Sequence, residues 1–154
     1  MVAISLLSIP VKDTVWWDTP GGKVTEYHDE TGSRCSLMIY DNEGSVTFEW
    51  GHQGETLVTA IDSNWAFPDN WKGPVAMQVG DVWLSNRADS AIIDAVGHGD
   101  AVIFTTDRPI DDLLRSAGQI VVKNTIADLS IKLEPAKMRI LSSRMRKCRD
   151  STKR

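Results

Sequence analysis

Short apolar runs separated by turn residues extend from residue 24 to residue 133 of the 154-residue chain. Runs of this length, interrupted at such close intervals, are typical of antiparallel sheets that pack as a sandwich or close into a barrel. We therefore predict a mainly β protein with an antiparallel β-sandwich or barrel-like fold. The predicted strands are Cys35–Tyr40, Ser45–Gly51, Thr56–Asp62, Val75–Val79, Val82–Asn86, Ile92–Val96, Ala101–Thr106, Gln119–Lys123 and Leu129–Leu133.

The strand at residues 45–51 has the clearest pattern. Val46, Phe48 and Trp50 alternate with polar residues, and a period of two places all three side chains on one face of a strand. We expect that face to lie in the core. The turn residues at 41–44 and 97–100 are predicted to join neighbouring strands.

Two helices are predicted to accompany the strands. A short helix near residues 109–117 has Asp107 as a possible N-cap. A C-terminal helix near residues 135–148 has apolar side chains at spacings of three and four, which is the pattern of a helix packed on one side. The residues of this buried stripe are Met138, Leu141, Met145 and Cys148.

The length of the chain is that of one domain. We predict a leader or N-terminal extension at residues 1–22, a single β-rich domain at 23–149 and a basic mobile tail at 150–154. The apolar stretch Val2–Ile9 is either the remnant of a signal-peptide core or an N-terminal strand or disordered leader. It is far shorter than the roughly 20 apolar residues of a membrane-spanning helix, so no transmembrane segment is expected.

Charge is distributed unevenly along the chain. Residues 135–154 contain eight Lys or Arg against one acidic residue, a net charge of +7, so the other residues contribute −11 to the total of −4. The basic segment either docks on its own acidic body, for which residues 27–30 and 107–112 offer carboxylates, or stays solvated, or contacts an anionic partner. The isoelectric point of about 5.3 argues against a nucleic-acid partner. The basic patch on the predicted helix consists of Lys137, Arg139, Arg144, Arg146, Lys147 and Arg149.

Cys35 and Cys148 are the only cysteines, too few and too far apart in sequence for a zinc site. They form either a disulfide or two buried thiols. A disulfide would close a loop of more than a hundred residues, stabilise the fold by about 4–5 kcal/mol, and require an oxidising compartment.

Residues capable of catalysis or metal binding form no recognisable motif. The spacing of His28, His52 and His98 matches no ligand pattern, and His28 and His98 fall in predicted turns beside glycines. No nucleophile elbow or Cys–His signature is present. Asp111 and Asp112 are better explained by the dipole of the predicted helix than by acid–base chemistry. We expect no catalytic residues, metal or cofactor.

Six tryptophans are more than average, and several lie in predicted loops or strand edges, including Trp16 and Trp17. The segment at residues 63–71 combines aromatic side chains with Pro and Asn, which makes it the best candidate in the chain for a recognition loop for a partner. Its candidate binding residues are Trp65, Phe67 and Trp71. We favour the other interpretation of this segment, a loop that folds back and caps the sandwich.

Four stretches match the layout of a known family: Cys35-Ser-Leu-Met-Ile, the run from Val75 to Leu84, residues 111–118 (DDLLRSAG), and Leu141 to Cys148. Their order, over most of the chain, resembles the invasion-associated locus B family. The resemblance implies an exported or periplasmic, non-enzymatic β-sandwich protein of proteobacteria, with members linked to host-cell contact. It also implies a Cys35–Cys148 disulfide. The chain departs from the family pattern in lacking a clear signal peptide and in ending with a basic segment.

Three hypotheses about function follow. The first is an exported or periplasmic binding or structural protein of the cell envelope, with a protein or cell-surface partner. The second is a cytoplasmic regulatory or inhibitory partner protein, which would have reduced cysteines. The third is a small hydrolase with a site near His98, Asp100 and His28.

Overall fold

The structure of the chain is a computed structural model that describes residues 12–30, 32–50, 55–68, 70–91, 100–106 and 110–152. In these ranges the protein is mainly β, as predicted. The strands are β1 (Lys12–Thr19), β2 (Gly22–Asp29), β3 (Gly32–Tyr40), β4 (Gly44–Trp50), β5 (Thr56–Asp62), β6 (Lys72–Val79), β7 (Val82–Ala91), β8 (Ala101–Thr106), β9 (Gln119–Lys123) and β10 (Leu129–Lys132). The helices are α1 (Ile110–Leu114) and α2 (Pro135–Thr152).

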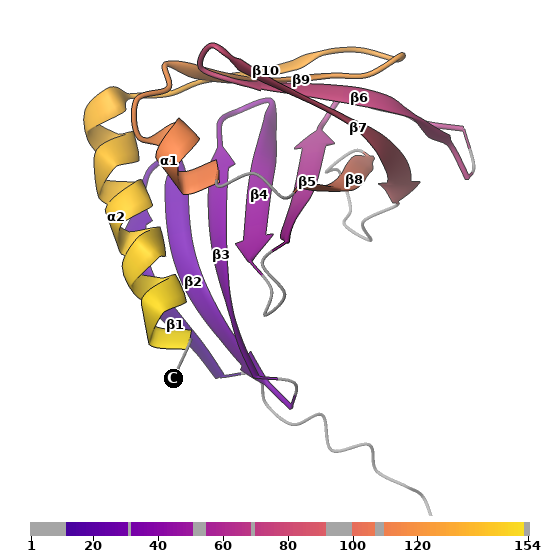
Figure 1. Cartoon of the computed structure of the whole chain (residues 1–154). Coiled ribbons are helices and arrows are strands. Elements are labelled where there is room, and N and C mark those ends of the chain that lie inside the picture. Colours follow the sequence, from indigo (N-terminus) through magenta and orange to yellow (C-terminus); the bar gives the residue numbers. More distant parts are fainter. Residues whose placement is uncertain are drawn as a thin grey trace, which may run out of the picture.

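The strands form one continuous antiparallel sheet in the order β1-β2-β3-β4-β5-β8-β7-β6-β9-β10. Figure 1 shows the sheet bending over on itself, so that β6, β7, β9 and β10 pass across the ends of β3, β4 and β5. Where β10 meets β4, the side chain of Leu129 lies against Gly44. A Cβ atom on Gly44 would overlap the carbonyl oxygen of Ile61, so this close approach of neighbouring strands requires glycine.

The core lies inside the folded sheet. Its side chains come from alternate positions of the strands, as expected from the sequence. Val46 and Phe48 are fully buried and Trp50 is 7% exposed. The predicted strands 56–62, 101–106 and 119–123 have the predicted bounds, and most others differ by a few residues at their ends. The strand predicted at 92–96 lies outside the described residues.

The first two strands were not among the predicted elements. Residues 12–19, predicted to be part of a leader or N-terminal extension, form β1, and His28, predicted to lie in a turn, lies in β2. A β-bulge between Val15 and Trp17 interrupts the pairing of β1 with β2. A bulge breaks the alternation of side chains between the two faces. The pattern of period two was therefore absent from this strand.

Both predicted helices are present, with different ends. α1 is shorter than the predicted 109–117, and its residues Ile110 and Leu114 are fully buried. α2 buries the predicted stripe of Met138, Leu141, Met145 and Cys148. It also continues through Thr152, so residues 150–152 belong to the helix and not to a mobile tail.

Helix α2 covers the first three strands of the sheet (Figure 1). Its apolar stripe faces β2 and β3, and the helix also contacts α1. Among the helices of the described residues, none is both long and apolar enough to cross a membrane.

Candidate functional site

A disulfide attaches the last turns of α2 to the sheet. Cys35 in β3 and Cys148 in α2 are bonded, with an S–S distance of 2.04 Å. The two residues are 1% and 0% exposed, so the bond is buried at both ends. The pairing implied by the family resemblance is therefore present in the structure.

Two arginines of α2 bind the acidic residues of α1. An Nη2 atom of Arg149 donates to Oδ2 of Asp111 at 2.6 Å, and Nη2 of Arg146 donates to Oδ1 of Asp112 at 2.7 Å. Asp111 is 2% exposed, whereas the side chain of Asp112 is 63% exposed. Because α1 has only five residues, the arginines, rather than a helix dipole, account for the position of these two carboxylates.

Two more basic residues of α2 also contact the body of the protein. Nζ of Lys137 donates to the backbone oxygen of Pro20 at 2.9 Å. The guanidinium of Arg144 lies 5.3 Å from the centre of the Trp17 ring, a cation–π distance. Much of the predicted basic patch is thus docked on its own domain, which was one of the alternatives left open by the sequence.

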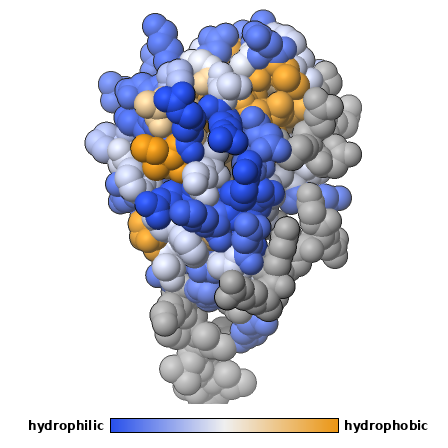
Figure 2. All heavy atoms as spheres, turned by 60° about the vertical axis from the view of Figure 1, so that its left-hand side comes forward, coloured by the Kyte–Doolittle hydropathy of each residue, from blue (hydrophilic) through white to orange (hydrophobic). Residues whose placement is uncertain are grey.

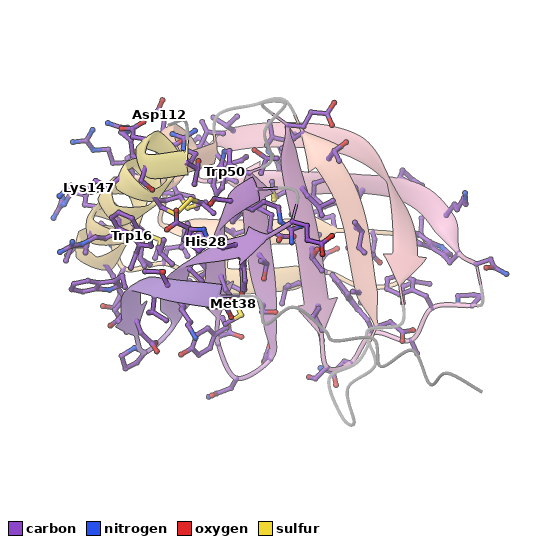
Figure 3. All side chains as sticks on the ribbon, turned by 90° about the horizontal axis from the view of Figure 1, so that it is seen from below. Trp16, His28, Met38, Trp50, Asp112 and Lys147 are labelled. Atoms are coloured by element: carbon purple, nitrogen blue, oxygen red, sulfur yellow. A yellow bond between two sulfur atoms is a disulfide. The ribbon has the colours of Figure 1, made fainter. Side chains whose placement is uncertain are left out.

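The remaining members of the patch, Arg139 and Lys147, are exposed. Figure 3 shows Lys147 pointing away from the sheet. Figure 2, which brings α2 forward, shows that this side of the molecule is dominated by hydrophilic side chains.

A partly buried polar cluster lies where the end of α2 meets β1 and β2. Its centre is the carboxylate of Glu26, which is 8% exposed. Its Oε2 atom accepts from Nε1 of Trp16 at 3.4 Å and lies 3.2 Å from Nε2 of His28, while Oε1 accepts from Oγ of Ser151 at 3.2 Å. The second ring nitrogen of His28, Nδ1, lies 2.6 Å from Oγ of Ser33.

The register of the β2–β3 hairpin brings these groups together. His28 is opposite Ser33, and Glu26 is opposite Cys35. Alternation along both strands therefore places Glu26, His28 and Ser33 on the face that carries the disulfide, beneath α2. Figure 3 shows Trp16 and His28 on this side of the sheet.

This arrangement determines which atoms of the cluster carry protons. If Nε2 of His28 donates to the Glu26 carboxylate, then Nδ1 is unprotonated and accepts the hydroxyl proton of Ser33. A hydroxyl, an imidazole and a carboxylate in this sequence of contacts form the relay that activates serine nucleophiles. The relay also satisfies the buried carboxylate, which would otherwise be costly to desolvate.

His28 was among the residues considered from the sequence, but Glu26 and Ser33 were not. A signal was present, because Glu26 and His28 have the spacing of two that places side chains on one face of a strand. The turn that joins β2 to β3 sets the register of the two strands, and the register places Ser33 opposite His28. His98, which also belongs to the hydrolase hypothesis, lies outside the described residues. His52, the remaining histidine of the chain, lies outside them as well.

The predicted recognition loop folds back onto the sandwich. Trp65 is 3% exposed, so the indole of this candidate binding residue is part of the core and does not face a partner. The ring of Phe67 lies 5.7 Å from that of Trp65 and 4.7 Å from that of Trp71. Asp100 anchors the loop, because its carboxylate accepts from the backbone N–H of Phe67 at 2.6 Å.

A loop that folds back was the favoured interpretation of this segment, and the burial of Trp65 agrees with it. Asp100, which fixes the loop, is distant from it in the chain. The three aromatic rings of the loop pack against one another and the core, so they do not need a partner to be covered. Phe67 and Trp71 are half-buried, so only their outer edges remain for a partner. Trp16 and Trp17 are also half-buried, in β1 rather than in a loop.

Within the described ranges, no group of three or more His, Cys, Asp or Glu residues is placed to hold a metal ion. Comparisons with models of protein families, with curated proteins and with solved structures found no match to this chain.

Proposed function

We propose that this chain is an exported or periplasmic protein with a binding or structural role in envelope or host-cell interaction. The observation that supports this proposal best is the buried disulfide between Cys35 and Cys148. Structural disulfides persist in oxidising compartments and are rare in the cytosol. The resemblance to the invasion-associated locus B family points to the same location.

The position of the disulfide suits a structural role. Neither sulfur is accessible for exchange with a thiol, so the bond is protected from the attack that makes redox-active disulfides labile. The bond holds α2 over β1, β2 and β3, where the helix covers apolar and polar groups that would otherwise face water. A protein with its last helix bonded to the sheet in this way would keep its shape in an oxidising compartment.

The test is intact-mass analysis of the protein purified from its native host, with thiol alkylation before and after reduction. We expect no alkylation until the protein is reduced, and a processed N-terminus. If both thiols are alkylated without reduction on an unprocessed chain, the proposal is wrong and a cytoplasmic partner protein is the better hypothesis. Alkylation under denaturing conditions is the necessary control, because burial alone would protect free thiols.

A second candidate function is hydrolysis of an ester at Ser33, favoured by the contacts of 2.6 Å and 3.2 Å that link Ser33, His28 and Glu26. Oγ of Ser33 would attack the carbonyl carbon while its proton moves to Nδ1 of His28. The bond to the leaving alcohol then breaks, and the alcohol takes that proton. Water attacks the acyl-serine in the same way and releases the acid.

A fluorophosphonate probe tests this second candidate directly, because it adds a defined mass to an activated serine. Labelling of the wild type that is lost in Ser33→Ala and in His28→Gln would support a hydrolase. Ser130→Ala, which removes an exposed serine on the other half of the sheet, is the matched control. Absence of labelling in the wild type, or labelling that survives in Ser33→Ala, would eliminate the candidate.

A further inference from the structure

The outer face of α2, which points away from the sheet, has exposed residues on every turn of the helix. They recur at spacings of three and four, on the side opposite the buried stripe. Figure 2, which brings this side forward, shows hydrophilic side chains over most of it. The exposed residues of the outer face are Ala136, Arg139, Ile140, Ser143, Arg146, Lys147 and Asp150.

The two helices together carry more positive than negative charge. Residues 110–115 and 134–152 contain seven Lys or Arg against four Asp or Glu, a net charge of +3. Three of the four carboxylates are in ion pairs: those of α1 bind Arg146 and Arg149, and Oε1 of Glu134 lies 3.6 Å from Nζ of Lys137. Only Asp150 remains to offset the basic residues that have no carboxylate partner in the described part of the chain, which are Arg115, Arg139, Arg144 and Lys147.

The exposed carboxylates of β1, which lies beneath α2, do not offset this charge. Asp13 is opposite Tyr27, and Asp18 is opposite Lys23. Both partners are at odd-numbered positions of β2, whereas Glu26, beneath α2, is at an even one, so the two carboxylates lie on the side of the sheet away from α2. At an ionic strength of about 0.1 M, salt screens exposed charges that are more than about 10 Å apart. The outer face of α2 therefore presents its own positive charge to a partner.

An apolar side chain lies among these cations. Ile140 is 42% exposed and follows Arg139 directly, and Lys147 is two helical turns further along the same side. The neighbours of Ile140 one turn away in each direction are Ala136 and Ser143, whose small side chains leave the isoleucine projecting from the helix. An isoleucine flanked by long basic side chains is an arrangement typical of surfaces that contact the headgroup region of a membrane.

We propose that the outer face of α2 binds the surface of an anionic lipid bilayer. Arg139 and Lys147 would pair with the phosphates of the headgroups, and Ile140 would enter the apolar boundary beneath them. The buried stripe of α2 stays in the core of the protein, so the helix would lie on the bilayer without inserting into it. Such binding is reversible and depends on salt.

A bilayer matches both features of this face, the unpaired positive charge and the exposed isoleucine between the cations. The backbone of a nucleic acid would supply phosphates for Arg139 and Lys147, but it would offer no apolar layer to Ile140. The outer side of a helix is also convex, so it suits a broad surface better than a small ligand that needs a cleft.

The proposal goes beyond the proposed location and role of the protein. It is tested by sedimentation of the purified, disulfide-bonded chain with vesicles, so its failure would leave the result of the alkylation experiment unchanged. One set of vesicles contains phosphatidylglycerol and phosphatidylcholine in equal parts, and the other contains phosphatidylcholine alone. We expect the protein to bind only the anionic vesicles at about 0.1 M salt, and to be released at about 1 M, where the screening length falls to about 3 Å.

Two variants of the outer face should bind more weakly. Replacement of both Arg139 and Lys147 by serine should lower the affinity about tenfold or more, because each basic residue near an anionic bilayer contributes about fivefold. Ile140→Ser should lower it by about fivefold, through the loss of apolar area in the bilayer.

Each variant has a matched control, which should bind within about twofold of the wild type. Replacement of both Lys123 and Lys132 by serine removes the same charge from β9 and β10. Ile126→Ser removes an isoleucine that is 45% exposed, in the connection between those strands. All the replaced side chains are exposed, so the variants are expected to fold, which far-ultraviolet circular dichroism checks.

Four results would overturn the proposal. The first is equal binding to vesicles of phosphatidylcholine alone, and the second is no binding of the folded wild type to anionic vesicles at low salt. The third is an equal loss of binding in the Lys123 and Lys132 variant, which would show an effect of total charge and not of α2. The fourth is displacement from the vesicles by short duplex DNA together with unchanged binding of Ile140→Ser, which would show a site for phosphates without a role for lipid.

Discussion

Simultaneous replacement of Cys35 and Cys148 by alanine is expected to cause a large loss of stability. The bond joins residues separated by 113 positions. In the chain-entropy treatment, opening a loop of that size lowers the free energy of unfolding by about 5 kcal/mol at 25 °C. For a protein of this length, this corresponds to a decrease of about 10–20 °C in the melting temperature.

The same reasoning locates the effect in the unfolded state. Without the bond the unfolded chain is more expanded, so the dependence of the unfolding free energy on urea should become steeper. The folded structure should change little, because α2 keeps its apolar contacts through Met138, Leu141 and Met145. Circular dichroism should therefore show native helix content in the variant below its transition.

Urea denaturation of the variant and of the wild type, with and without reductant, is the assay. The reduced wild type should have nearly the same free energy of unfolding as the double alanine variant. This comparison controls for the removal of two buried sulfur atoms in the variant. A free energy of unfolding within about 1 kcal/mol of the oxidised wild type, with an unchanged urea dependence, would refute the entropic argument.

Two further predictions compare a buried residue with an exposed one of the same type, each by urea denaturation. Asp111→Ala should lower the free energy of unfolding by about 2–3 kcal/mol because it leaves Arg149 without its carboxylate; the loss is smaller than for a fully buried pair because the Arg149 side chain is 26% exposed. Asp112→Ala should lower it by under about 1 kcal/mol. Equal losses in the two variants would contradict the different burial of the two carboxylates. Trp65→Ala should cost about 3–5 kcal/mol because the indole fills the core. Trp83→Ala should stay within about 1 kcal/mol, and a tolerated Trp65→Ala would show that the loop does not cap the sandwich.

The elements that could be predicted from the sequence are those with a regular apolar pattern. The alternation of Val46, Phe48 and Trp50 predicted a strand and its buried face, and both are confirmed. The stripe at spacings of three and four predicted the buried side of α2. In both cases the period of the backbone alone determines which side chains share a face.

The candidate sites depend on polar groups and loop residues. Whether such residues are buried does not follow a regular spacing along the chain, so it could not be predicted in this way. Trp65 carries the same aromatic side chain whether it is exposed or buried, and its state depends on a loop fixed by Asp100. The carboxylates that bind Arg146 and Arg149 of the basic patch also lie on a separate helix, α1. The sequence predicted that acid at 107–112 was available, but not which arginine would reach it.

The sequence by itself determined that this chain is mainly β and that its last helix is packed along one side, because local periodicity follows from backbone geometry. Only the tertiary structure decided that β1 belongs to the sheet and that Glu26, His28 and Ser33 meet beneath α2. Glu26 also contacts Ser151, which is 125 positions away. A buried carboxylate requires partners with correct geometry, and those partners are chosen by the folding of the sheet and helix rather than by neighbouring residues.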